Sequence, residues 1–214
     1  MSSLPQTTRT DTADRMLDLA EMLVQTRGFN GFSYADIASE LGVTKATLHY
    51  HFPTKAELGL RLIRRYTEVF TAALSQIDDR TIEPLERLRS YVEIYSIVLH
   101  QQRMCLCGML AADYATLPVP MKTALTQFFE ANERWLVDVL DQGRATGHFQ
   151  FSGNALDVAR LLVSSLEGAM LVARTFGQPE RFQSIAGRLL DGLSATEFTE
   201  TEQVKLLPEQ PVAE

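Results

Sequence analysis

Apolar residues recur at intervals of three and four along almost the whole chain, and no segment alternates apolar and polar residues as a half-buried strand does. This spacing predicts an all-α protein. Glycine, proline and capping residues divide the pattern into about nine helices. We expect these helices to span residues 11–27, 34–40, 45–51, 55–77, 84–101, 108–117, 121–144, 155–176 and 181–195.

Three closely spaced helix starts distinguish the stretch from Ser33 to Leu58. Ser33 is a capping residue in front of a short amphipathic helix, and Gly42 ends that helix because glycine adopts a left-handed backbone conformation at little cost. Thr44 can cap the helix that follows. A helix, a glycine turn and a second helix form the helix-turn-helix arrangement.

The second helix of this unit, Lys45 to His51, is mostly polar. At roughly 10 Å long it buries too little apolar surface to be explained by packing alone, and only Leu48 within it is plainly a core residue. We therefore expect its outer face to contact something polar outside the protein. Thr54 and Glu57 then form a capping box, and Lys55 in the first turn of the next helix adds a positive charge suited to phosphate.

At these positions the chain resembles the TetR family of bacterial transcriptional regulators. The family pattern has an Ile-Ala pair, a Gly-Val-Ser/Thr turn, Thr-Leu-Tyr-x-His-Phe in the recognition helix, and then x-x-Lys-x-x-Leu. One position departs from that pattern, because His49 stands where the family usually has tyrosine. The matching segments here are Ile37-Ala38, Gly42-Val43-Thr44, Thr47-Leu48-His49-Tyr50-His51-Phe52 and Lys55 to Leu58.

The resemblance implies contacts with double-stranded DNA, in which base contacts specify sequence and phosphate contacts fix register. The alternative is that Tyr50 and the histidines pack within their own domain. His49 and His51 point about 200° apart on a helix, which argues against a metal site there. The residues implied to face bases or the groove wall are Lys45, Ala46, Thr47 and Tyr50. Those implied to hold the DNA backbone are Ser33, Tyr34, His49, His51, Thr54 and Lys55, and Thr44 is a further DNA-binding candidate.

The net charge of −7 is unusual for a protein that binds DNA, but the charge is unevenly distributed. Salt screens exposed charges beyond about 8 Å, so the local sign matters more than the total. Residues 44–66 contain five basic residues against Glu57 alone, whereas residues 196–214 are acidic. We expect three parts: an arm and DNA-binding domain over 1–54, a helical effector-binding and dimerisation domain over 55–196, and an acidic, disordered tail over 197–214.

Composition and cysteine count indicate a cytoplasmic location. Hydrophobic residues make up 45% of the chain, which is ordinary for a globular protein, and the longest apolar run, Met104 to Ala112, is too short to span a membrane. The first ten residues lack the apolar segment of a secretory signal. Two cysteines close together do not make a disulfide framework. No cofactor is indicated.

The resemblance places a small-molecule effector pocket in the middle of the chain. Such sites are mostly apolar with a few polar groups, and aromatic side chains line them readily. The alternative for each residue is an ordinary place in the core. The candidates are Tyr95, His100, Met104, Met109, Tyr114, Phe128, Phe129, Trp135, Glu167 and Met170.

Cys105 and Cys107 are candidates for redox chemistry. Some TetR relatives carry a Gly-Cys-Leu-x-Gly-Asn segment here, although this chain has Met104 and Met109 in place of its glycine and asparagine. A helix N-terminus near Arg103 could lower the pKa of the Cys105 thiol and make it reactive. The alternative is that both thiols are small buried hydrophobes.

The last two helices have the composition of a dimer interface. Small residues lie among leucines there, which allows two helices to approach closely and predicts a four-helix bundle across a two-fold axis. The residues expected to contribute most are Leu161, Ser165, Gly168, Leu189 and Leu193.

These observations favour a homodimeric DNA-binding regulator, with a repressor released from a palindromic operator by a small-molecule effector as the leading interpretation. An activator has the same sequence features. The alternatives are a regulator that responds to oxidants or electrophiles through Cys105 and Cys107, or a small helical redox enzyme using these thiols and acidic residues near Asp113. The sequence shows no nucleophile, general base and orienting residue at a spacing that would indicate a catalytic site.

Overall fold

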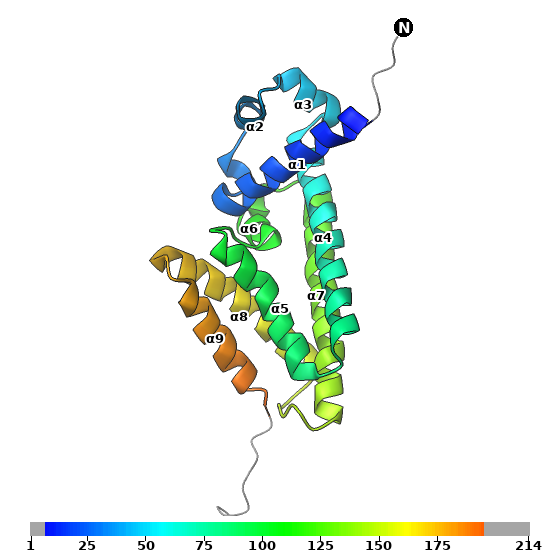
Figure 1. The fold of residues 1–214 in the computed structure, drawn as a ribbon, viewed down its shortest axis with the longest axis vertical. Helices are drawn as coiled ribbons and strands as arrows, with labels where there is room; N and C mark the ends of the chain where they lie inside the picture. Colours follow the sequence, from blue (N-terminus) through cyan, green and yellow to red (C-terminus); the bar gives the residue numbers. More distant parts are fainter. Residues whose placement is uncertain (1–6, 195–214) are drawn as a thin grey trace, which may run out of the picture.

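The computed structural model describes residues 7–194, with side chains from Thr12 onward, and within this range the chain is all-α as predicted. The one extended pairing is an isolated bridge between Phe149 and Ser194. The expected tail over 197–214 and the first six residues of the expected arm lie outside the described residues. The α-helices are α1 Thr7–Arg27, α2 Tyr34–Leu41, α3 Lys45–His51, α4 Lys55–Arg80, α5 Pro84–His100, α6 Leu106–Ala112, α7 Val119–Ala145, α8 Ala155–Phe176 and α9 Pro179–Asp191, with short 3₁₀ helices η1 Phe29–Gly31 and η2 Tyr114–Thr116 (Figure 1).

Local capping signals set the ends of the first helices as the sequence predicted. The Asp36 carboxylate accepts a hydrogen bond from the backbone amide of Ser33 at 2.7 Å. Gly42 ends α2 with a φ of 65°. The hydroxyls of Thr44 and Thr54 accept from the backbone amides three residues later, at the starts of α3 and α4.

Some helix bounds differ from the sequence prediction. The helix expected over 108–117 is α6, which starts at Leu106 because the Cys105 sulfur accepts from the backbone amide of Gly108 at 3.4 Å. It ends at Ala112 and is followed by η2. Helices α7 and α9 each have a proline in their first turn, where a missing N–H removes no helical hydrogen bond, so both begin two residues earlier than expected.

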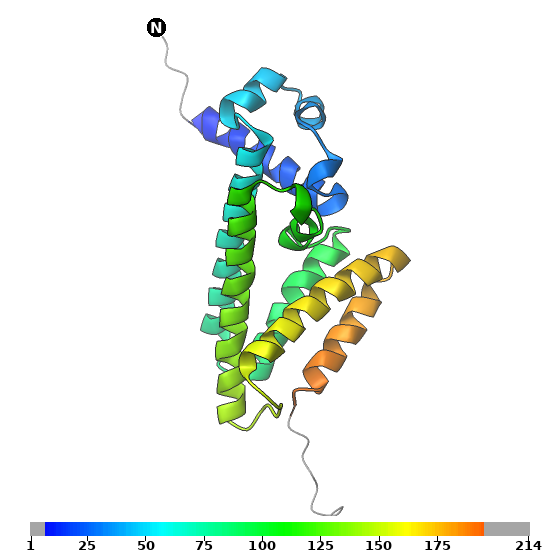
Figure 2. The same cartoon turned by 180° about the vertical axis from the view of Figure 1, so that it is seen from behind.

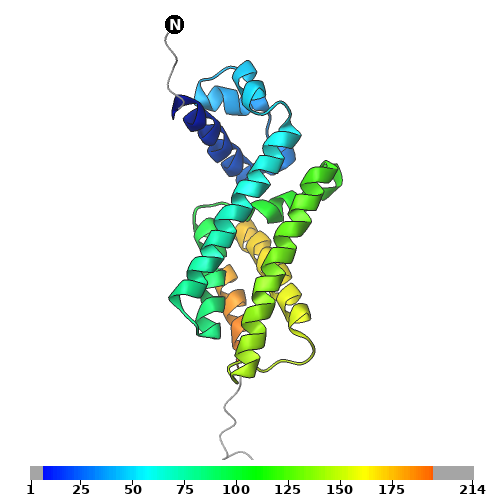
Figure 3. The same cartoon turned by 90° about the vertical axis from the view of Figure 1, so that its right-hand side faces the viewer.

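The molecule consists of a small head, residues 7–54, above a larger body, residues 55–194 (Figure 1). The long helices α4 and α7 lie side by side along the body, and α4 runs directly out of the head (Figure 3). Helices α8 and α9 pack together on another side, with α5 beside α9 (Figure 2). The head core contains Met16, Ile37 and Leu48, each fully buried.

Aromatic side chains fill the centre of the body. Phe70 of α4 meets the rings of Tyr91, Tyr95 and Phe128 edge to face, with centroids 5.3 to 6.1 Å apart. These pairs join α4, α5 and α7. None of the helices within residues 7–194 combines the length and apolar character that crossing a bilayer requires.

Replacing Gly143 by alanine tests how tightly the turn after α7 packs. A Cβ atom at Gly143 would lie 2.1 Å from the ring of Phe149, which is buried. We expect Gly143→Ala to lower the free energy of unfolding by about 1–3 kcal/mol, because overpacking forces side chains and backbone to shift. The measurement is chemical denaturation. Asp138→Ala, at an exposed position of the same helix, is the control and should change stability by less than about 0.5 kcal/mol. Equal effects of the two substitutions would contradict this account of the turn.

Candidate nucleic-acid interface and ligand pocket

Helix α3 lies at the outer end of the head and exposes one polar face (Figure 1). Leu48 is fully buried beneath it, whereas Tyr50 is 60% exposed. Thr47 is half-buried, and its hydroxyl lies 2.9 Å from that of the capping residue Thr44. The polar segment is therefore not packed inside its own subunit. The other exposed residues of this face are Lys45, Ala46 and His49.

Several residues expected to contact the DNA backbone also make contacts within the head that position α3. The Tyr34 hydroxyl donates to the Phe52 carbonyl at 2.7 Å, and burial raises the pKa of this phenol to about 12. His49 lies 3.1 Å from the Pro53 carbonyl through Nδ1 and packs against the Tyr34 ring. Tyr34 is therefore an internal support of the helix that follows. His51 also packs within the head, between the rings of Tyr50 and Phe52, while Ser33 and Thr54 remain exposed.

Lys55 does not face outward as the sequence interpretation expected. Its ammonium donates to the backbone carbonyls of Phe29 and Phe32, each at 2.5 Å, and lies over both aromatic rings. Burial lowers the pKa of this ammonium, while the carboxylates of Asp113 and Asp36 act in the opposite direction. The side chain connects the start of α4 to the loop after α1.

The positive charge available near α3 is smaller than the sequence suggested. Arg65 forms ion pairs with Asp18 at 2.7 Å and Glu21 at 2.8 Å, so its guanidinium connects α4 to α1. With Lys55 also bonded internally, three of the five basic residues counted between residues 44 and 66 stay exposed. These three are Lys45, Arg61 and Arg64.

A carboxylate from the body joins the two parts of the molecule at a contact that sequence reasoning missed. Asp113, directly after α6, accepts from the backbone amides of Phe29 at 2.7 Å and Asn30 at 3.3 Å. The Asn30 side chain donates to the Thr116 hydroxyl at 2.9 Å. We call these contacts the head–body junction. Its partners are more than 80 residues apart in sequence, so no local signal identifies them.

A cavity of about 500 Å³ lies between α6, α7 and α8, and three of the ten effector candidates, Met104, Phe129 and Glu167, line it. Burial raises the pKa of the Glu167 carboxyl to about 7. Its Oε1 atom is buried without a hydrogen-bond partner among the described residues. The carboxyl lies against Gly108, where an added Cβ would come within 2.1 Å of Oε2. The full lining is Met104, Gly108, Ala111, Ala112, Phe129, Glu133, Val163, Ser164, Glu167, Gly168 and Leu171.

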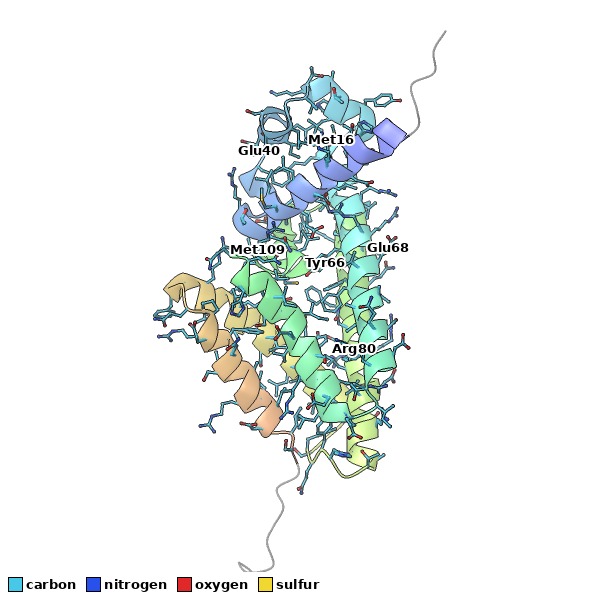
Figure 4. The ribbon with its side chains drawn as sticks, viewed as in Figure 1. Met16, Glu40, Tyr66, Glu68, Arg80 and Met109 are labelled. Atoms are coloured by element: carbon cyan, nitrogen blue, oxygen red, sulfur yellow. The ribbon has the colours of Figure 1, made fainter. Side chains whose placement is uncertain are left out.

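The other effector candidates lie elsewhere. Tyr95 and Met170 are buried in the core, because the aromatic cluster fills the space expected for a ligand. Phe128 and Trp135 border a separate cavity of about 120 Å³, and the Trp135 indole donates to Asp78 at 3.0 Å. His100 is exposed at the end of α5, and its ring is hydrogen-bonded to the Ser96 carbonyl. The Met109 sulfur lies 3.9 Å from the Arg174 guanidinium, near the head (Figure 4). Tyr114 is 49% exposed.

Both cysteine thiols are buried, and the lowered pKa expected for Cys105 is wrong. Burial, reinforced by the nearby Glu167 carboxyl, raises the pKa of both thiols. Tyr66, on the inner side of α4 (Figure 4), donates its hydroxyl to the Cys105 sulfur at 3.7 Å. Cys105 caps the start of α6.

The outer face of α8 is apolar and exposed, and it includes two of the residues expected at a dimer interface. Leu161 is 58% exposed, and nothing lies within 4 Å of a Cβ built on Gly168. Ser165 and Leu189 are half-buried. Leu193 is buried within its own subunit because its carbonyl accepts from Gln150, which draws the end of α9 against the turn after α7. Further exposed apolar residues on this side are Leu171, Val172, Phe176 and Ile185.

Comparisons with known proteins agree with this architecture. Residues 16–62 match the family model described as bacterial regulatory proteins, tetR family, and residues 84–188 match the tetracyclin repressor-like C-terminal domain. The transcriptional regulator AcuR of Cereibacter sphaeroides is 26% identical over 162 residues, which are 74% of each chain. The repressor KstR2 of Mycobacterium tuberculosis is 26% identical over 63% of this chain and 68% of its own length.

Solved structures show the same relationship. A TetR family regulator from Agrobacterium tumefaciens superposes with a TM-score of 0.84 and 31% identity, covering 87% of this chain and all of that one. A TetR regulator from Legionella pneumophila gives a TM-score of 0.77 and 29% identity, covering 91% of this chain and all of its own. These relatives are transcriptional regulators. The chain thus belongs to the tetR family of bacterial regulatory proteins and is a DNA-binding transcriptional regulator.

Proposed function

We propose that this protein is a homodimeric repressor, acting in the cytoplasm, that leaves a palindromic operator when a small molecule enters the cavity between α6, α7 and α8. The observation that carries the proposal is that one short helix, α6, both lines this cavity and ends at the head–body junction. A ligand that contacts α6 can therefore influence the head directly.

The exposed face of α3 supports its role as a recognition helix. A helix placed in the major groove reads base edges with side chains near its start and along its outer face. Lys45, Ala46 and Tyr50 occupy that face, while Leu48 anchors the helix to the head core. In this proposal Tyr34 and His49 act indirectly, by fixing the orientation of α3.

The exposed side of α8 and α9 supports dimerisation. A contiguous apolar surface on a water-soluble domain is costly unless a partner covers it. Leu161, Gly168 and Val172 recur along one side of α8, and Gly168 permits close approach of a second helix. A two-fold dimer presents two α3 helices and matches two half-sites related by the same symmetry.

The coupling that we propose runs through α6. Gly108, Ala111 and Ala112 of α6 line the cavity, and the next residue, Asp113, bonds the head. A ligand that binds better when α6 is displaced shifts the population toward conformations in which the Asp113 contacts are broken. The two heads then no longer match successive grooves. Helix α4, which runs from the head past the body core, is the second connection.

Tyr50→Ala tests sequence reading by α3. The DNA is first selected from a random pool with the wild-type protein, and affinity is then measured by fluorescence anisotropy on the selected operator and on a random duplex. We expect affinity for the operator to fall at least about tenfold, equivalent to about 1.4 kcal/mol, with little change on the random duplex. Glu40→Ala, at an exposed position of α2, is the control and should retain both affinities. An equal loss on both duplexes for Tyr50→Ala would refute a reading role.

Leu161→Asp tests the dimer. A carboxylate buried in an apolar helix interface is strongly unfavourable, so the variant should have the mass of one 24.0 kDa chain by light scattering, whereas the wild type has twice that mass. Circular dichroism should remain helical. Val69→Asp, an equally exposed apolar position on α4, should remain dimeric. A wild-type mass of one chain at micromolar concentration would contradict the proposal.

Asp113→Ala tests the head–body junction. Without the carboxylate, the backbone amides of Phe29 and Asn30 lose their acceptor, so their hydrogen exchange should accelerate relative to amides in α3. Operator affinity should also fall, because a less fixed head loses more conformational entropy on binding. Glu83→Ala, an exposed acidic position at the far end of the body, should alter neither quantity. Unchanged exchange at both amides would show that Asp113 does not restrain the head.

A further inference from the structure

The cavity between α6, α7 and α8 combines apolar walls with negative charge. Met104, Phe129 and Leu171 supply apolar surface, whereas Glu133 and Glu167 supply two carboxyl groups. None of the described residues lining the cavity is lysine, arginine or histidine. Its volume of about 500 Å³ falls within the range of small-molecule sites, roughly 300–1,000 Å³. An anionic ligand would meet two carboxyl groups with no lining cation to balance its charge.

The two carboxyl groups are not equivalent. Glu133 lies nearer the surface and has a guanidinium partner, with Arg160 Nε 3.7 Å from Oε2. Glu167 is the deeper group. The Cys105 thiol interacts with its carboxyl, but the Oε1 atom is buried and has no hydrogen-bond partner of ordinary geometry among the described residues. Buried polar atoms are nearly always hydrogen-bonded. A polar atom buried without a partner loses the hydrogen bond that it made to water in the unfolded chain, and this loss destabilises the fold. Glu167 is therefore the unsatisfied group in this cavity.

The described surroundings of Glu167 contain weakly acidic groups, and no positive side chain contributes to its pKa. Five buried groups interact with this carboxyl, and burial raises the pKa of each: Tyr66 on α4, Tyr91 and Tyr95 on α5, Cys105 at the start of α6 and Cys107 within α6. Burial also raises the pKa of the Glu167 carboxyl, to about 7. A cation in the cavity would favour the ionised form.

We propose that the ligand of this cavity is a hydrophobic organic cation, a protonated amine or a quaternary ammonium ion, whose positive group lies against Glu167. This inference rests on the proposed function, since it names the chemical class of the effector. The apolar part of the ligand packs against Met104 and Leu171, and Phe129 can stack on the cation or on its apolar body. A protonated amine would donate the hydrogen bond that Oε1 lacks, whereas a quaternary ammonium ion would balance the charge of the carboxylate without donating a hydrogen bond.

The position of Glu167 also connects ligand binding to α6. Its carboxyl lies against Gly108 so closely that any side chain there would collide with it. A cation that draws the carboxylate into the cavity changes this contact, and Gly108 is five residues before Asp113 on the same short segment. Recognition of charge and displacement of α6 thus occur at one place.

The test compares ligands of equal shape and different charge. Benzyltrimethylammonium and its neutral carbon isostere, neopentylbenzene, are titrated into the full-length protein without DNA, and binding is followed by calorimetry and by thermal shift. We expect the cation to bind at least tenfold more tightly. Glu167→Gln should remove that preference by weakening cation binding at least tenfold, with the isostere changed less than threefold. Glu133→Gln should weaken cation binding less than Glu167→Gln does, because Arg160 already compensates Glu133.

Two pH measurements provide readouts that do not depend on DNA. Cation affinity should increase from pH 6 to pH 8 as Glu167 ionises, and this dependence should vanish in Glu167→Gln. The Glu167 carboxyl has a higher pKa in the folded chain than in the unfolded chain. It therefore lowers the free energy of unfolding progressively as the pH rises from the carboxyl's pKa in the unfolded chain to about 7. Without ligand, Glu167→Gln should therefore raise Tm more at pH 8 than at pH 5.

Equal affinity of the wild type for the cation and its isostere, or binding of neither, would overturn the ligand class. That result would leave proposed effector release intact, because this titration contains no DNA. A separate anisotropy experiment on the selected operator tests release: cation binding in the cavity without loss of operator affinity would retain the ligand class and contradict the proposed function. A preference for the cation that survives in Glu167→Gln would also overturn the assignment to Glu167.

Discussion

The relation between head and body depends on the Asp113 carboxylate, which satisfies two backbone amides of the head from a position in the body. These amides open the 3₁₀ turn after α1, where no helical partner is available to them. Lys55 completes the arrangement from the other side by donating to the carbonyls of Phe29 and Phe32. The backbone amides of the loop between α1 and α2 are therefore bonded by a carboxylate, and its backbone carbonyls by an ammonium group.

This arrangement explains how a small head acquires a fixed orientation. Met16, Ile37 and Leu48 pack at the centre of the head, and the contacts of Asp113, Lys55 and Arg65 help to fix how the head sits on the body. Apolar packing also continues from the head into the body, where Phe29 and Met121 both lie against Gly59. The polar contacts depend more strongly on geometry than this packing does, so they are the part of the contact most sensitive to a small change of head orientation.

The body contains polar groups that stability alone does not explain. Glu167 is half-buried, its Oε1 atom is buried without a partner among the described residues, and its carboxyl contributes to the raised pKa of the Cys105 and Cys107 thiols. An apolar residue would fill the same space at lower cost. Groups of this kind commonly mark sites where stability is given up for binding. The cysteines, by contrast, are accounted for by packing and by the cap of α6.

The sequence by itself determined the helices, the turn at Gly42 and the caps at Ser33, Thr44 and Thr54, because these depend on neighbours within about four residues. It also identified Met104 and Glu167 as candidates that the cavity brings together. Only the tertiary structure decided that Lys55 turns inward, that Leu193 is buried in its own subunit and that Asp113 meets the head. Those outcomes depend on partners distant in sequence, whose approach is set by the packing of whole helices.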